Sequence, residues 1–120
     1  MKQVLQLEEL AQMILGIAGL YFISFHFSWW LWIILFLSPD ISFLAYCINK
    51  KAGAVGYNIL HHKGLAVAVV AAGFLYRTEV ATFIGVLLFT HSSFDRLLGY
   101  GLKYTDDFKH THLGFIGKKK

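Results

Sequence analysis

The chain has 120 residues, which suits one domain; 57% of them are hydrophobic and only 15% are charged. Soluble domains carry about 25% charged residues, so the composition excludes an ordinary soluble domain and predicts a protein that uses a bilayer as a second apolar solvent. The net charge is +4, but the lysines lie at the ends of apolar segments, so we expect no nucleic-acid partner.

Four apolar stretches are each long enough to cross a bilayer core, which takes roughly 20 helical residues. They run from Leu5 to Phe25, from Ser28 to Asn49, from Gly53 to Tyr76 and from Val80 to Leu102. The connections between them are very short, and short connections join antiparallel neighbours. We therefore predict an all-α fold: an integral membrane four-helix bundle of up-down-up-down topology over residues 1–102, then a basic and aromatic cytoplasmic tail over residues 103–120.

Pro39 lies near the middle of the second predicted span. Proline removes one backbone hydrogen bond, so we predict a kink in that helix. Ser38 and Ser42 flank the proline, and their hydroxyls can bond the carbonyls that it frees.

The distribution of basic residues predicts an orientation. Arg77 alone falls on one side of the predicted membrane, and eight lysines fall on the other: Lys2, Lys50, Lys51, Lys103, Lys109, Lys118, Lys119 and Lys120. Because short cytoplasmic loops and ends carry the excess of positive charge, this pattern predicts a multi-pass protein with both termini in the cytoplasm.

Polar residues interrupt the apolar spans: Asp40, His61, His62, Lys63, His91, Asp95 and Arg96. A charged group at mid-bilayer costs at least ~2.5–3.5 kcal/mol, so these side chains must pair, bind something or face water. At a rise of ~1.5 Å per residue, Asp40, His61, His91 and Asp95 lie about 10–16 Å below the cytoplasmic ends of their spans. His91 and Asp95 also share one helix face, being four residues apart. The pattern predicts one polar layer in the cytoplasmic half.

The first hypothesis for this layer is a divalent metal site with Asp40, His61, His91 and Asp95 as ligands. A mixed histidine and carboxylate set suits Zn²⁺ or another first-row metal. A metal with an open position can activate water, so the chain would be a metal-dependent hydrolase acting on a lipid or membrane-soluble substrate. In that hypothesis His62 is a further ligand or the general acid/base, and Arg96 and Lys63 hold an anionic group such as phosphate.

Two non-enzymatic alternatives remain open at this point. The layer is also explained by a structural polar network, in which Asp95 pairs with Arg96 or Lys63, or by a proton or ion path. Such a path through four short helices would need a homo-oligomer. Four further residues are left undecided as members of the site: Glu8, Glu9, His110 and His112.

Several motifs resemble those of a family of small bacterial integral membrane proteins, domain of unknown function 4260. They are SPDIS at 38–42, YNILHHK at 57–63, HSSFDRLLGYGLKY at 91–104 and THLG at 111–114. The resemblance covers nearly the whole chain. It implies a bacterial cytoplasmic (inner) membrane location and supplies no activity.

A looser similarity is to inner-membrane putative metal-dependent hydrolases, which also carry Pro-Asp, a later His and His-x-x-x-Asp. Here Pro39-Asp40, His61 and His91-x-x-x-Asp95 match in order. The pattern departs in two places, since Ser42 stands where that family tends to have a second Asp, and Lys63-Gly64 replaces a Thr-His. The similarity favours a metal site more than it favours hydrolysis.

Overall fold

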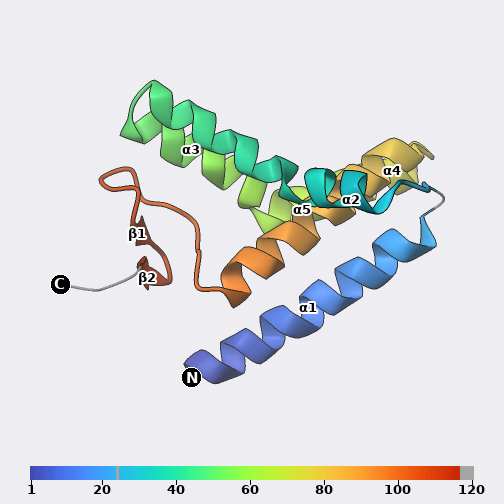
Figure 1. Ribbon diagram of the computed structural model, residues 1–120, viewed down its shortest axis with the longest axis horizontal. Helices are drawn as coiled ribbons and strands as arrows, with labels where there is room; N and C mark the ends of the chain where they lie inside the picture. The colour runs from blue at the N-terminus through green and yellow to red at the C-terminus, as the bar shows by residue number, and fades with distance from the viewer. Residues whose placement is uncertain (24, 117–120) are drawn as a thin grey trace.

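The computed structural model describes residues 1–23 and 25–116, and helices account for most of these residues (Figure 1). The helices are α1 (Lys2–Phe22), α2 (Trp29–Leu37), a 3₁₀ helix η1 (Ser38–Cys47), α3 (Lys50–His61), α4 (Lys63–Leu75) and α5 (Glu79–Leu97). In the tail, β1 (His110–Thr111) pairs with β2 (Gly114–Phe115) as a short antiparallel hairpin. The prediction of a mainly helical fold is confirmed.

The structure has two or three candidate membrane spans among its described residues, against the four predicted. Among the described residues, α1 and the continuous α2–η1 helix, Trp29–Cys47, are long and apolar enough to cross a membrane. Helices α3 and α4 make a third candidate only as one broken span, because they are bent by 47°. Helix α5 does not qualify, since the polar run from Thr90 to Arg96 lowers its mean hydropathy. The four-span topology is therefore not confirmed.

The second predicted span changes helix type at Pro39, and a kink there is not confirmed. The α-helical hydrogen bonds of α2 give way to 3₁₀ hydrogen bonds from Ser38 onward. Pro39 has no N–H to donate to the Leu35 carbonyl, and the Ser38 hydroxyl donates to that carbonyl instead, at 2.7 Å. Ser38 thus has the expected role, whereas the buried Ser42 hydroxyl has no hydrogen-bond partner among the described residues.

His62 breaks the third predicted span into two helices. Its backbone is extended, with φ −86° and ψ 115°, so α3 ends at His61 and α4 begins at Lys63. The exposed His62 ring accepts a hydrogen bond from the Leu65 N–H at 3.1 Å and so caps α4. Irregular backbone at membrane depth is tolerated where protein surrounds it or a cavity adjoins it.

The distribution of polar and apolar residues is inverted relative to a soluble protein. Thr90, His91, Ser92 and Ser93 on α5 are at most 1% exposed, whereas apolar side chains along α1, α2 and η1 are mostly exposed. A protein in water would bury the second group and expose the first. An apolar surface around a polar interior fits a bilayer, which supports the prediction of a membrane protein.

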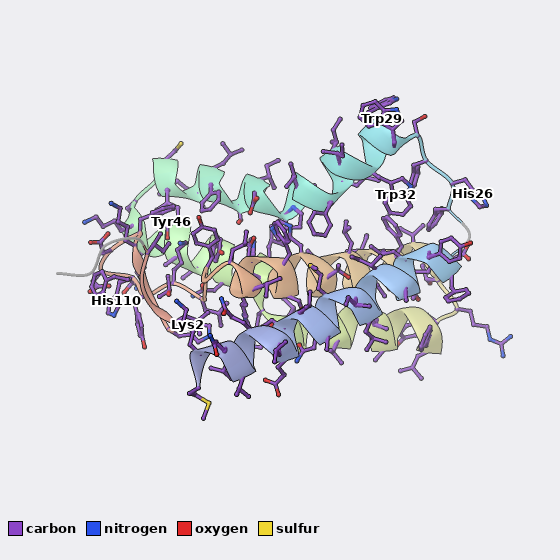
Figure 2. All side chains as sticks on the ribbon, turned by 60° about the horizontal axis from the view of Figure 1, so that its bottom comes forward. Lys2, His26, Trp29, Trp32, Tyr46 and His110 are labelled. Atoms are coloured by element: carbon purple, nitrogen blue, oxygen red, sulfur yellow. The ribbon has the colours of Figure 1, made fainter. Side chains whose placement is uncertain are left out.

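Helix α5 lies at the centre of the molecule and packs against α1 and α4, while α3 packs against η1 (Figure 1). Glycines allow the close approach: a Cβ on Gly16 of α1 would overlap Thr90, and one on Gly73 of α4 would overlap Thr82. Lys2 and the tail residue His110 lie at one end, and His26, Trp29 and Trp32 lie at the other (Figure 2).

Candidate metal centre

Four side chains from three helices meet inside the bundle: Asp40 of η1, His61 of α3, and His91 and Asp95 of α5. One ligand atom of each lies within 4.8 Å of the corresponding atoms of the other three. The Nε2 atoms of His61 and His91 face Asp40 Oδ1 at 3.4 and 3.1 Å, and Asp95 Oδ2 at 3.1 and 3.3 Å. We call these four residues the His/Asp cluster.

Hydrogen bonds to the backbone fix both imidazole rings. The Nδ1–H of His61 donates to the carbonyl of Tyr57 at 2.9 Å, and the Nδ1–H of His91 donates to the carbonyl of Phe36 at 2.6 Å. With Nδ1 protonated, a neutral ring presents an Nε2 lone pair. Metal-binding histidines usually donate their second ring nitrogen in this way.

The two irregular points in the helices lie beside the His/Asp cluster. In an α-helix the Phe36 carbonyl would accept from Asp40, and in a 3₁₀ helix it would accept from Pro39, which has no N–H. Because η1 is a 3₁₀ helix, this carbonyl is open to His91. The break at His62 makes His61 the last residue of α3, at the point where that helix meets α5. The helices are thus irregular where η1 and α3 supply their side chains to α5.

Tyr57 forms a second layer of contacts around the cluster. Its ring stacks on the His61 ring with centroids 3.9 Å apart, and its hydroxyl donates to Asp95 Oδ2 at 3.2 Å. Lys103 covers the other face, with its Nζ 4.6 Å from the Tyr57 ring centroid and 4.1 Å from that of Phe108. Burial lowers the pKa of Lys103, although the Asp95 carboxylate opposes that shift.

Asp40 is the cluster residue that is open to its surroundings. Its side chain is 37% exposed, against 0% for His91, 3% for His61 and 12% for Asp95. Any small molecule that reached the cluster would therefore approach from the Asp40 side.

The geometry of the cluster fits a small divalent cation. Tetrahedral zinc at about 2.0–2.2 Å from nitrogen and oxygen ligands places those ligand atoms about 3.3–3.6 Å apart. Four of the six separations between the ligand atoms are 3.1–3.4 Å. If both rings are neutral, their protons are on Nδ1, and two carboxylate oxygens face two nitrogen lone pairs with no proton between them. The repulsion between these groups is unfavourable unless a cation lies among them.

The three residues predicted to have catalytic roles lie around the cluster rather than in it. His62 is exposed and caps α4. The Lys63 ammonium donates to Glu9 and Gln12 of α1, so it is already paired. Arg96 donates from Nη2 to the carbonyl of His61 at 3.3 Å, where a cation also complements the dipole at the end of α3.

Of the residues left undecided, none lies within the cluster. Glu9 pairs with Lys63, whereas His110 pairs with Asp106 at 2.9 Å in the tail. The Nδ1 of His112 accepts from the Leu102 N–H at 2.8 Å. The contact of Lys103 with Tyr57 was missed from the sequence, because no spacing rule connects a tail residue to a helix end. Tyr57 itself was indicated by its spacing, since a residue four positions before His61 lies on the same helix face and can contact its ring.

A family model described as Domain of unknown function (DUF4260) matches residues 2–116, which include the whole His/Asp cluster. No curated protein matches this chain, and no solved structure matches it. The looser similarity to putative metal-dependent hydrolases is not supported by these comparisons. Since the matched region runs from the start of α1 to the end of the tail hairpin, this chain belongs to the DUF4260 family, whose function is unknown.

Proposed function

We propose that this chain is a membrane protein that binds a divalent metal ion at Asp40, His61, His91 and Asp95. One observation supports the proposal: four potential ligand atoms lie within 4.8 Å of one another, the four His–Asp separations among them are 3.1–3.4 Å, and both histidines donate Nδ1–H to backbone carbonyls. Two imidazoles and two carboxylates favour Zn²⁺ or another first-row metal over Mg²⁺, which prefers oxygen ligands.

We also propose a multi-pass arrangement in the bacterial inner membrane with both termini in the cytoplasm. The end of the molecule at which Lys2 and the tail gather would lie on the cytoplasmic side (Figure 2). The opposite end, with Trp29 and Trp32, would lie at the outer interface, where tryptophan is enriched. The uneven distribution of lysine supports this orientation.

We further propose that the metal site catalyses hydrolysis. When bound, the metal would polarise a carbonyl or phosphoryl oxygen and activate water. The half-exposed Asp40 supports this reading, because a catalytic site needs one open side and a structural site does not. The substrate would be a lipid or another membrane-soluble ester, since the surface around the bundle is largely apolar.

Metal content of the purified protein is the primary test. The detergent-solubilised chain is loaded with Zn²⁺ or Mn²⁺, dialysed and measured by elemental analysis, beside His91→Ala, Asp95→Ala and the control His26→Ala. His26 is exposed at the opposite end of the molecule, so its loss should leave the metal content unchanged. We expect about one ion per chain in the wild type and in His26→Ala, and less than about a tenth of that in the other two variants.

Substitution with Co²⁺ separates loss of the site from loss of the fold. A tetrahedral Co²⁺ complex has visible absorption bands, so a folded variant that retains these bands still has the site. No metal in the folded wild type would refute the proposal and would leave the cluster as a hydrogen-bonded polar network. Metal binding without turnover of phosphoester and carboxylester lipids would refute the hydrolase part alone.

A further inference from the structure

A second candidate site lies at the end of the molecule that holds Lys2 and the tail hairpin (Figure 2). A cavity of about 870 Å³ opens between the first turns of α1, the end of α5 and the tail. None of the four cluster residues lines it, so it is separate from the metal centre.

The charges lining this cavity are unevenly balanced. Arg96 and Lys2 line it, and neither lies within ion-pair distance of a carboxylate anywhere in residues 1–23 and 25–116. Glu9 also lines the cavity, but the Lys63 ammonium neutralises it. The lining therefore has an excess of positive charge.

Hydrogen-bond donors remain available in the cavity. Arg96 has five N–H groups, and the hydrogen bond to the His61 carbonyl uses one of them. His112 accepts at Nδ1 from the Leu102 N–H, so the neutral ring carries its proton on Nε2 and can donate from there. A planar guanidinium with free donors suits an oxyanion, and phosphate above all.

The rest of the cavity wall is apolar. Leu5, Leu98 and Leu113 line it beside the charged groups, and all three side chains are more than two-fifths exposed. A soluble anion such as free phosphate gains no binding free energy from contact with these leucines. An amphiphile can contact both regions of the cavity, with its headgroup bound to Arg96 and Lys2 and its hydrocarbon chain packed against the leucines.

We propose that this cavity binds the phosphate headgroup of an anionic membrane phospholipid, with Arg96 and Lys2 as the charged contacts and His112 as a further donor. The proposal goes beyond the metal centre and does not depend on it. Lipid with a net negative charge is favoured over zwitterionic lipid, because neither Arg96 nor Lys2 forms an ion pair with a carboxylate of the described residues, and the one carboxylate in the lining, that of Glu9, pairs with Lys63.

Native mass spectrometry of the full chain, released from detergent, tests this proposal. The probes are phosphatidylglycerol, phosphatidylcholine with the same acyl chains, and soluble glycerol phosphate. We expect one phosphatidylglycerol adduct on the wild type, with occupancy about tenfold above that of phosphatidylcholine. Glycerol phosphate is expected to bind far more weakly. Equal binding of both lipids, or equal binding of glycerol phosphate, would overturn the proposal.

Charge-matched variants locate the adduct. Arg96→Gln should lower the affinity for phosphatidylglycerol by about tenfold, the loss expected for one charge-assisted contact. Lys51→Gln removes a charge at the exposed start of α3, outside the cavity lining, and should leave the affinity unchanged. Equal losses in the two variants would show general surface attraction and refute the site. If Arg96→Gln does not fold, Lys2→Glu replaces it, and unchanged binding in that variant refutes the proposal as well.

Discussion

Tyr57 contacts two residues of the His/Asp cluster at once, through different parts of its side chain. Its ring lies against the His61 ring with 7° between their planes, and its hydroxyl donates to the Asp95 carboxylate. Its own carbonyl accepts the Nδ1–H of His61. One residue on α3 therefore orients one cluster residue from its own helix and one from α5.

Removing the Tyr57 hydroxyl should weaken metal binding without unfolding the protein. Tyr57→Phe keeps the ring stack and deletes the hydrogen bond to Asp95, and the loss of such a second contact layer typically costs 10–100-fold in metal affinity. We expect an affinity for Zn²⁺ about tenfold lower, measured by competition with a chelating dye. Tyr21→Phe is the matched control, because Tyr21 is 81% exposed. An unchanged affinity in Tyr57→Phe would show that Asp95 needs no orientation by this hydroxyl.

Lys103 should hold the tail on the bundle. Its side chain is 5% exposed, its Nζ donates to the Phe108 carbonyl at 3.0 Å, and the Asn58 side chain bonds its backbone N–H and C=O at 2.7 and 2.8 Å. Lys103→Met removes the cation from between the rings, which is worth about 2 kcal/mol when desolvated. We expect faster amide hydrogen exchange over residues 102–112 in this variant.

Lys109→Met is the control for the tail prediction. Lys109 is exposed, and no ring contact involves its ammonium among the described residues. Equal exchange in both variants would mean that the backbone bonds to Asn58 alone hold the tail.

The helical content and the residues of the cluster were predictable from the sequence, and the helix breaks were not. Apolar runs of helical length predict helices directly. The break at His62 is invisible to hydropathy, because a cap formed by one imidazole on Leu65 changes no apolar pattern. The sequence predicted a membrane span from Val80 to Leu102, whereas α5 ends at Leu97. Most of the polar residues in its second half are buried inside the molecule, and α5 is not a candidate span.

The meeting of Asp40, His61, His91 and Asp95 was predicted from their depth, together with the four-residue spacing of His91 and Asp95. Alternating helix directions bring residues at equal depth together, whatever their order in the chain. Depth could not distinguish His61 from its neighbour His62, because adjacent residues differ by only ~1.5 Å. The local backbone decides it: His61 is still helical and points inward, while His62 is extended and faces outward.

Docking of the tail should weaken in acid. Partial removal from water, together with the charge of Arg96, lowers the pKa of His112 in the folded chain, although Glu9 opposes the shift. The undocked tail therefore takes up a proton first, and docking is lost as pH falls from the ordinary histidine range through the lowered pKa. Protonation at Nδ1 would also remove the acceptor for the Leu102 N–H. We expect protection of the Leu102 amide against hydrogen exchange to fall between about pH 7 and pH 5.

His112→Asn tests that this dependence comes from the ring. An asparagine side-chain oxygen can accept from the same N–H and does not titrate over this range. The variant should keep its protection at pH 5, and loss of protection in both proteins would assign the effect to another group, such as the Asp106–His110 pair.

The contact between Gly16 and Thr90 should control how closely α1 approaches the helix that carries His91. A Cβ at Gly16 would overlap the Thr90 hydroxyl, so Gly16→Ala must push α1 away from α5 or displace Thr90, at a cost of about 1–3 kcal/mol. Thr90 immediately precedes His91, so a displaced Thr90 should also weaken metal binding.

Gly19→Ala is the matched control, since the nearest atom to its Cβ would be a Val86 methyl at an ordinary 3.4 Å. Melting temperature and Zn²⁺ affinity should therefore fall in Gly16→Ala and stay near wild type in Gly19→Ala. In the double variant Gly16→Ala/Thr90→Ala the hydroxyl is absent, so part of both losses should be recovered. Equal behaviour of the two alanine variants would mean that α1 does not depend on this contact.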